Sequence, residues 1–235
     1  MKKLESINPM FGENLNSEGY VTLPCLGKDD IKLLIDLFNE FHPSLPEGFY
    51  ASTHSIDKNS RKEISEQIAE VVRPKIVNLF SNLELLGGAF ISKAPGTKGI
   101  LPLHQDWNIV NEKEARSYNL WIPLVDVNEG NGAMRILKQS HLKQETYRGP
   151  NLYPTLSNIS KLVDENMVSL NMMAGEALLY DHALWHSSPV NQSNQLRLAV
   201  VFGIIPKGVE MKFYHQNGNQ IEEYNSYPSF FFEND

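Results

Sequence analysis

The stretch that decides the fold class is EALLYDHALWHSSPVNQSNQLRLAVVFGIIP, residues 176–206. Two apolar runs flank a polar segment that is rich in Pro, Asn and Ser. Short apolar runs bounded by turn-forming residues are typical of β-strands. The pattern therefore predicts strands on both sides of a turn-rich connection.

The same pattern recurs outward from this stretch over the second half of the chain. Strand-like runs separated by Gly, Pro and Asn occupy residues 84–95, 117–127, 132–139, 167–174, 176–186, 196–206 and 211–217. Such a succession of short strands is typical of a sandwich or jelly roll. We therefore expect the second half of the chain to form a β-rich core.

The first half carries helical signals. Apolar residues at helical spacing predict a helix over 29–42, with Asp29 or Asp30 as its N-cap. A second helix is predicted over 60–84, and Pro74 should kink or split it. Helices followed by a run of strands lack the regular alternation of parallel-sheet proteins. The fold class is therefore expected to be mainly β with flanking α-helices.

Composition and charge exclude several classes of protein. A net charge of -7 argues against a nucleic-acid-binding face and against an anionic membrane surface. No apolar run approaches the roughly 20 residues that span a bilayer. The start MKKLESINPM has no apolar core after its lysines, so it is not expected to be a secretory signal. Cys25 is the only cysteine, so no internal disulfide can form. We therefore expect a cytoplasmic protein in which Cys25 is not catalytic.

A candidate metal site begins in LPLHQDWNIV, residues 101–110. In an extended strand, His104 and Asp106 project to one face and Gln105 to the other. Two histidines and one carboxylate form the triangular face that binds iron in many oxygenases. The third ligand must come from another strand, and the candidates are His141, His182 and His186.

A charged residue inside a later apolar strand is the next signal. Arg197 lies eleven residues after His186, in LRLAVVFGII. An unpaired guanidinium is costly to bury, so a partner is expected. That partner is either a bound carboxylate, which a guanidinium holds with two hydrogen bonds, or a salt bridge to Asp126, Glu129 or another carboxylate reached through the fold.

Taken together, these motifs resemble the phytanoyl-CoA dioxygenase family over residues 85–206. They are H-x-D at 104–106, W-x-P-L-x-D at 121–126, N-G-A at 131–133, S-H at 140–141, H-S-S at 186–188 and the arginine at 197. The sequence departs from the usual pattern at ILKQSHLK (136–143), where family members often have Pro-Gly-Ser-His. The departure leaves the turn before His141 open.

The resemblance implies an iron(II)- and 2-oxoglutarate-dependent oxygenase on a double-stranded β-helix, a jelly roll of cupin-like form. The single domain would span 1–235, with a helical part at 1–84 and the β-helix core at 85–217. Carried over residue by residue, the iron ligands are His104, Asp106 and His186, and the cosubstrate-binding residues are Arg197, Ser188 and Trp121. Asn119 shares the strand parity of Trp121 and is a further candidate to donate to the cosubstrate.

The resemblance also implies Fe(II) as cofactor, 2-oxoglutarate and O2 as cosubstrates, and support of activity by ascorbate. Related halogenases lack the ligand carboxylate, so Asp106 favours hydroxylation or desaturation. The substrate is expected to be a small-molecule metabolite, whose identity and oxidised position stay open, as does the oligomeric state. The alternative is a cupin-like metal-binding barrel without oxygenase activity, either an isomerase or a ligand-binding module.

Other polar residues carry secondary predictions. His182 is expected to be a pocket-wall histidine rather than the third ligand, and His141 a turn-stabilising group. Tyr50 and His54 are candidates to approach the substrate from the helical half. The long segment 142–168 interrupts the strands, and such loops are often lids. We expect it to cover the site, and its candidate substrate contacts are Tyr147, Arg148 and Tyr153.

Overall fold

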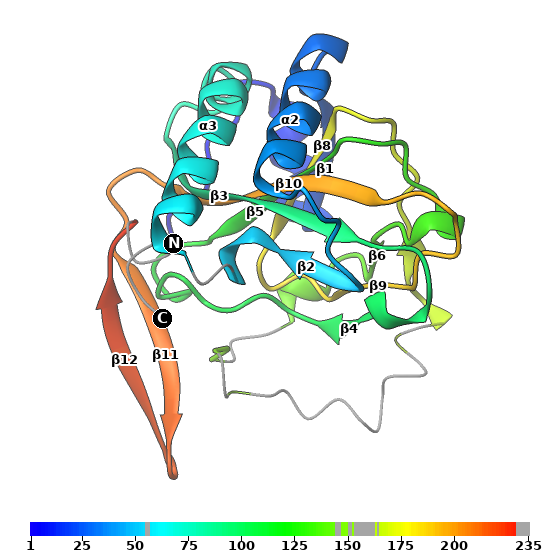
Figure 1. The fold of residues 1–235 in the computed structure, drawn as a ribbon. Coiled ribbons are helices and arrows are strands. Elements are labelled where there is room, and N and C mark those ends of the chain that lie inside the picture. Colours follow the sequence, from blue (N-terminus) through cyan, green and yellow to red (C-terminus); the bar gives the residue numbers. More distant parts are fainter. Residues whose placement is uncertain (55–56, 144–146, 150–151, 153–162, 164, 229–235) are drawn as a thin grey trace.

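The computed structural model describes residues 1–54, 57–143, 147–149, 152, 163 and 165–228. Its elements form three layers (Figure 1): helices above, a larger sheet in the middle and a smaller sheet below. The predicted class, mainly β with flanking helices and jelly-roll architecture, is confirmed. The two sheets do not close into a barrel.

The larger sheet has the strand order β1-β8-β5-β10-β3-β2, and each pair of adjacent strands is antiparallel. The strands are β1 (Tyr20–Pro24), β2 (Phe49–Ala51), β3 (Leu83–Lys93), β5 (Tyr118–Pro123), β8 (Glu176–Asp181) and β10 (Arg197–Pro206). Strands β1 and β2 come from the part of the chain that the sequence predicted to be helical. Both are short and lie at the two edges of the sheet. Their strand conformation therefore depends more on pairing with β8 and β3 than on any local sequence pattern.

The smaller sheet has the order β4-β9-β6-β7 and is also antiparallel. Its strands are β4 (Leu101–His104), β6 (Arg135–Ile136), β7 (Val168–Ser169) and β9 (His186–Ser188). A separate hairpin of β11 (Met211–Asn217) and β12 (Gln220–Ser226) projects from the body in Figure 1. The smaller sheet is the one that carries both candidate histidine ligands.

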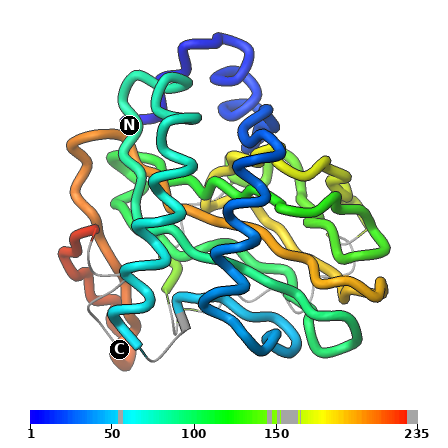
Figure 2. Tube along the Cα trace, turned by 45° about the horizontal axis from the view of Figure 1, so that its top comes forward, coloured from blue at the N-terminus to red at the C-terminus, as the bar shows by residue number. Residues whose placement is uncertain are grey.

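The helices are α1 (Pro9–Ser17), α2 (Lys28–Phe41) and α3 (Lys58–Ile76), and α2 and α3 run side by side over the larger sheet (Figure 2). The N-cap of α2 is Gly27 rather than Asp29 or Asp30; instead the Asp30 carboxylate accepts from the Gly27 N–H at 2.9 Å. Pro74 lies in the last turn of α3, so it does not split the helix. The described part of the chain contains no helix that is long and apolar enough to cross a membrane.

Short 3-10 turns connect several elements: η1 (Ser52–His54), η2 (Thr97–Gly99), η3 (Glu129–Asn131) and η4 (Ser140–Leu142).

Strand β10 separates two apolar clusters by the alternation of its side chains. Leu198, Val200 and Phe202 pack in the cluster beneath the helices. Ala199 packs with Trp121 in the cluster between the two sheets. Since alternate residues of a strand share a face, Arg197 lies on the face toward the smaller sheet. The fold thus aims Arg197 at the same interior into which β9 brings its residues.

Candidate metal and anion site

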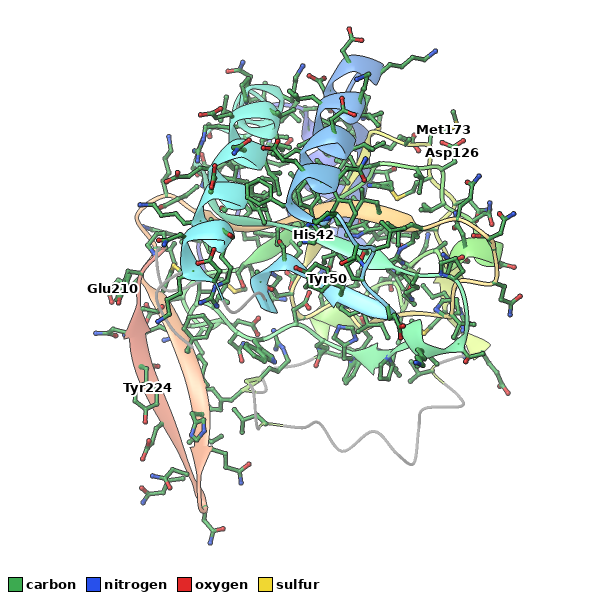
Figure 3. All side chains as sticks on the ribbon, viewed as in Figure 1. His42, Tyr50, Asp126, Met173, Glu210 and Tyr224 are labelled. Atoms are coloured by element: carbon green, nitrogen blue, oxygen red, sulfur yellow. The ribbon has the colours of Figure 1, made fainter. Side chains whose placement is uncertain are left out.

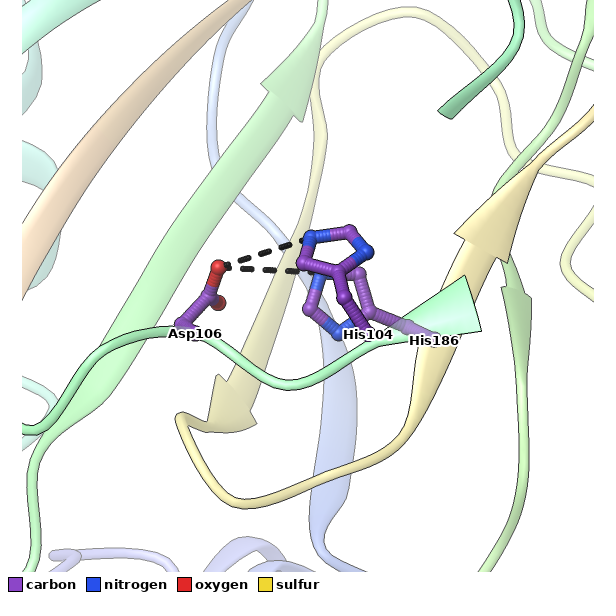
Figure 4. A group of neighbouring side chains, drawn as sticks. All are labelled: His104, Asp106 and His186. Carbon is purple, nitrogen blue, oxygen red and sulfur yellow. Dashed lines mark ion pairs between the residues drawn. The ribbon is translucent and has the colours of Figure 1, made fainter. Parts of the chain in front are cut away.

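Three predicted ligands come together at one end of the smaller sheet. His104 ends β4 and His186 begins β9, and the two are direct partners in the antiparallel pairing. Their ring centroids lie 4.1 Å apart. Asp106 follows β4 by two residues and faces both rings (Figure 4). One potential ligand atom from each of the three residues lies within 4.8 Å of the others.

The hydrogen bonds of the two rings leave the same nitrogen free on each. His104 Nδ1 lies 2.7 Å from the Pro102 carbonyl oxygen, and His186 Nδ1 lies 2.9 Å from that of Leu184. A carbonyl only accepts, so each Nδ1 carries the hydrogen and each Nε2 keeps its lone pair. Burial, together with the charge of His104, lowers the pKa of His186 to about 4. His186 is therefore a neutral imidazole at pH 7, the form that binds a metal.

Asp106 is oriented by its own partners. Asn119 donates from its side-chain amide to Asp106 Oδ2 at 2.8 Å and also contacts the Tyr180 hydroxyl. Burial raises the pKa of the Asp106 carboxyl, but the surrounding histidines and the Asn119 hydrogen bond outweigh it and lower the pKa to about 2. The side chain is thus ionised at pH 7. Its other oxygen, Oδ1, faces the two Nε2 atoms.

The distances fit one metal ion between the three groups. Asp106 Oδ1 lies 3.8 Å from His104 Nε2 and 3.8 Å from His186 Nε2. These separations are too long for hydrogen bonds. They are shorter than two metal–ligand bonds of about 2.1 Å placed end to end. Two imidazoles and one carboxylate suit iron and also accept zinc or manganese.

The competing histidines lie outside this cluster. His182 Nδ1 pairs with the Ser117 hydroxyl at 2.9 Å, and the His182 carbonyl accepts from the Asp106 N–H at 3.0 Å. His182 therefore supports the ligand loop through its backbone. His141 lies in the turn η4, and its Nε2 is 3.1 Å from the Asn16 carbonyl of α1. This backbone contact is consistent with the turn-stabilising role expected for His141.

Arg197 is only 3% exposed. Its Nη1 donates to the Gly132 carbonyl at 2.5 Å and to Ser188 Oγ at 2.9 Å, while Nε has no partner. Its guanidinium carbon lies 5.6 Å from the ring centroid of Trp121. Arg197 thus reaches the predicted residues Ser188 and Trp121.

The salt bridges considered for Arg197 do not form in the described part of the chain. Asp126 accepts instead from the Ala174 N–H at 2.8 Å, beside Met173 at the edge of the molecule (Figure 3). Glu129 lies exposed in η3. Arg197 therefore has no carboxylate partner among the described residues. The alternative explanation of its burial, a salt bridge within the protein, required such a partner.

A second cation beside Arg197 was not predicted from the sequence. Lys93, the last residue of β3, is fully buried and pairs in register with Arg197. Its Nζ donates to Ser188 Oγ at 2.5 Å. The available signal was parity: Ala89, Ile91 and Lys93 alternate along one strand, so a lysine sits where apolar residues face the interior.

Asn119 lies beside the clustered residues. Its amide donates to Asp106 and to the Tyr180 hydroxyl, so it orients a candidate ligand carboxylate. A contact between Asn119 and the cosubstrate stays a prediction. Burial raises the pKa of the Cys25 thiol to about 12, so the thiol is protonated at pH 7.

Within the segment 142–168, Arg148 lies against the loop that carries Asp106. Arg148 is buried; its Nε donates to the Asp106 carbonyl at 2.6 Å, and its Nη2 lies 2.6 Å from a Glu112 oxygen. These contacts hold Arg148 against the loop, and its contact with a substrate stays a prediction. Tyr147 is 45% exposed and its ring packs on Tyr214. Tyr153 lies outside the described residues, and the lid stays a prediction.

Of the two predicted substrate contacts from the helical half, Tyr50 packs beneath α2. The Tyr50 hydroxyl lies 2.9 Å from His42 Nε2, under the end of α2 (Figure 3). His42 stacks on Phe38, which belongs to the cluster between helices and sheet. The side chain of His54 lies outside what the structure describes.

The family model for phytanoyl-CoA dioxygenase (PhyH) matches residues 39–199. This range covers most of the chain, including the three clustered ligands and Arg197. The chain belongs to the phytanoyl-CoA dioxygenase family.

Solved structures with a similar fold include enzymes of nogalamycin biosynthesis. The carbocyclase SnoK from nogalamycin biosynthesis, described as non-heme and alpha ketoglutarate dependent, is 16% identical with a TM-score of 0.65, covering 87% of this chain and 86% of its own. HygX from Streptomyces hygroscopicus, solved with nickel and 2-oxoglutarate, is 15% identical with a TM-score of 0.61, covering 86% and 88%. The epimerase SnoN, solved with Fe3+, alpha ketoglutarate and nogalamycin RO, is 16% identical with a TM-score of 0.62, covering 86% and 85%.

A curated relative is the dioxygenase andF of Emericella variicolor, 26% identical over 119 residues. The match spans 47% of this chain and 37% of that protein.

Proposed function

We propose that this protein is an iron(II)- and 2-oxoglutarate-dependent dioxygenase that hydroxylates a small-molecule metabolite. The observation that carries the proposal is a pairing of two sites in one interior. The cluster of His104, Asp106 and His186 offers a metal three ligand atoms, and the neighbouring guanidinium of Arg197 is buried without a carboxylate. An anionic cosubstrate that binds the metal at one end and a cation at the other satisfies both.

Each residue has a defined task in this proposal. His104, Asp106 and His186 hold iron(II), and their hydrogen bonds to carbonyls and to Asn119 keep the free Nε2 and Oδ1 atoms aimed at the ion. Arg197 binds the far carboxylate of 2-oxoglutarate through its unpaired Nε edge, and Ser188 lies beside it. Trp121, whose ring lies beside the Arg197 guanidinium, would line the binding site of the cosubstrate. Iron(II), 2-oxoglutarate and O2 together supply the oxidising chemistry, which ascorbate supports.

The ligand set favours hydroxylation or desaturation over halogenation. Asp106 supplies a third protein ligand, so no position of the triad is left for a halide. The fold itself serves several outcomes, since similar structures include an epimerase and a carbocyclase. SnoN has been solved with nogalamycin RO bound and HygX with hygromycin B bound, which supports a small organic substrate here.

The buried cations argue against the alternative of a cupin-like metal barrel without oxygenase activity. A barrel that only binds a metal has no need of a buried guanidinium close to it. Burying such a group without an anion costs several kcal/mol. The cost is explained when the site regularly holds a carboxylate.

The test is coupled turnover. Purified protein with iron(II), ascorbate and O2 is incubated with candidate metabolites, and succinate is quantified against 2-oxoglutarate consumed. We expect slow succinate formation without substrate, a faster rate with the right metabolite, and none in His186→Ala. His215→Ala, an exposed histidine on β11, is the matched control and should behave as the wild type. Activity restored to metal-free protein by zinc but not by iron would contradict the proposal.

A further inference from the structure

The three clustered ligands are held in place by different means. His104 and His186 lie on paired strands, so the ladder between β4 and β9 fixes their backbone. Asp106 lies two residues beyond β4, in a segment that belongs to no strand (Figure 4). Ligands must be held within about 0.5 Å of the geometry that a metal needs. The backbone of Asp106 therefore needs support from elsewhere.

Two backbone hydrogen bonds supply this support. The Asp106 N–H donates to the His182 carbonyl at 3.0 Å, and the Asp106 carbonyl accepts from Arg148 Nε at 2.6 Å. The preceding residue, Gln105, donates from its side chain to the Ala183 carbonyl at 2.5 Å. The position of Asp106 thus depends on Arg148 and on the turn that follows β8.

Two buried ion pairs stand behind these supports. Glu112 accepts from Arg148 Nη1 at 3.0 Å and from its Nη2 at 2.6 Å. Asp181 accepts from Arg116 Nε at 2.8 Å and from its Nη2 at 2.6 Å. Asp181 Oδ1 also accepts from the Ala183 N–H at 2.8 Å, which fixes the turn after β8. Both pairs are bidentate, a geometry that holds each guanidinium in one orientation.

Arg116 joins the two pairs into a ring. Its Nη1 lies 3.9 Å from Glu112 Oε2, so its guanidinium stands between the two carboxylates. The contacts therefore run from the Asp106 carbonyl through both pairs to the turn that accepts the Asp106 N–H. We call Glu112, Arg116, Arg148 and Asp181 the charge ring, and none of these side chains is more than 9% exposed.

The placement of the charge ring indicates more than a contribution to stability. Replacing a buried ion pair by apolar side chains of similar size is often neutral or stabilising, so such pairs are weak evidence of a stabilising role. Bidentate pairs do restrict groups to one geometry, and both ends of this ring reach the backbone of one ligand. The ring is therefore suited to fixing the position of Asp106.

We propose that the charge ring positions Asp106 for metal binding, and that Arg116 is the positioning residue that joins its two halves. This role rests on the proposed function, which places a metal ion at the cluster. Arg116 itself contacts none of the three ligands. Without its guanidinium the turn after β8 is no longer tied to Arg148, and the Asp106 carboxylate loses its fixed distance to the two imidazoles.

The test is metal affinity, measured by calorimetry with nickel(II), which imidazole nitrogens bind well. The double variant Arg116→Met/Asp181→Asn removes both central charges and keeps an acceptor for the Ala183 N–H. We expect the Kd for nickel(II) to rise about 10- to 100-fold, the usual effect of removing a group that supports a ligand. Arg116→Lys keeps the charge without the planar fork and should cause a smaller rise.

Lys75→Met is the matched control. It breaks an ion pair with Asp30, at 2.8 Å, that joins α3 to α2 on the helix side of the larger sheet (Figure 1). The Kd for nickel(II) should stay at the wild-type value in this variant, even if the protein is less stable.

A double-mutant cycle separates positioning from general damage. In the Asp106→Ala background the ring substitutions should cost no further nickel affinity, because the carboxylate that the ring positions is gone while both histidines remain. An unchanged Kd in the ring variants, an equal loss in the Asp106→Ala background, a raised Kd in Lys75→Met, or failure of both ring variants to fold would overturn the proposal. Wild-type protein that binds neither nickel(II) nor iron(II) would instead contradict the proposed function.

Discussion

At the scale of single residues, the hydrogen bonds of each imidazole ring indicate which histidine can bind a metal. His186 has its Nδ1 bound to a carbonyl and its Nε2 free toward Asp106, whereas His182 has its Nδ1 on Ser117 and lies outside the cluster. The H-S-S motif and the spacing to Arg197 had already pointed to His186. The structure adds the physical reason, which is the direction of the free lone pair.

Alanine substitutions should separate the two histidines. We expect His186→Ala to lose iron(II) binding, because two remaining ligands hold the ion poorly. His182→Ala should keep iron bound and lower turnover by about 10- to 100-fold, the usual effect of removing a supporting group near a ligand. Equilibrium dialysis against iron(II) without O2 measures the first quantity. Loss of iron in His182→Ala with retention in His186→Ala would reverse the assignment.

The sequence could supply the three clustered residues and Arg197, because each stands in a short motif with fixed spacing. It could not supply the partners of Lys93 or the bond from Asn119 to Asp106. Lys93 gains its meaning only when β3 pairs with β10 and places it opposite Arg197. That pairing joins residues about a hundred positions apart, which no local pattern records.

At the scale of elements, the same limit explains which strands were missed. β3, β5, β8 and β10 carry continuous apolar runs because the sheet is buried on both faces, and these the pattern predicted. β1 lies at an edge of the sheet and pairs only with β8. Its five residues therefore carry too weak a signal to separate them from the neighbouring helices.

An ion pair joins the segment 142–168 to the loop that carries Asp106. Arg148 and Glu112 are both nearly buried and lie 2.6 Å apart, and Arg148 also binds the Asp106 carbonyl. Arg148→Met leaves the Glu112 carboxylate buried with a weaker partner, Arg116, at 3.9 Å. We expect the free energy of unfolding to fall by about 3–5 kcal/mol, as when a buried pair loses one member. Urea unfolding followed by circular dichroism measures it.

The exposed pair Lys98–Glu47, at 3.2 Å, is the control for that measurement. Lys98→Met should barely change the free energy of unfolding, because water screens surface pairs. Equal and small effects of the two substitutions would mean that Arg148 does not hold the loop.

At the scale of the whole molecule, the two sheets bring a metal site and a cation site into one interior. The smaller sheet supplies His104 and His186, and the larger sheet supplies Arg197 and Lys93. The two sets meet at Ser188 on β9, which lies two residues after the candidate ligand His186 and accepts hydrogen bonds from both cations. A molecule that reaches from the metal to the cations must therefore span between the sheets.

The most direct test of this claim is an anaerobic titration of iron(II)-loaded protein with 2-oxoglutarate, followed by the visible absorption that appears when a 2-oxoacid chelates iron(II). We predict saturation at one 2-oxoglutarate per chain in the wild type. Arg197→Ala should still bind iron(II), but its binding of 2-oxoglutarate should weaken by about 2–5 kcal/mol, the cost of losing a buried charge pair. Arg197→Lys should recover only part of that binding free energy, because lysine lacks the planar guanidinium. Absence of the band in iron-loaded wild type, or an unchanged titration in Arg197→Ala, would contradict the account.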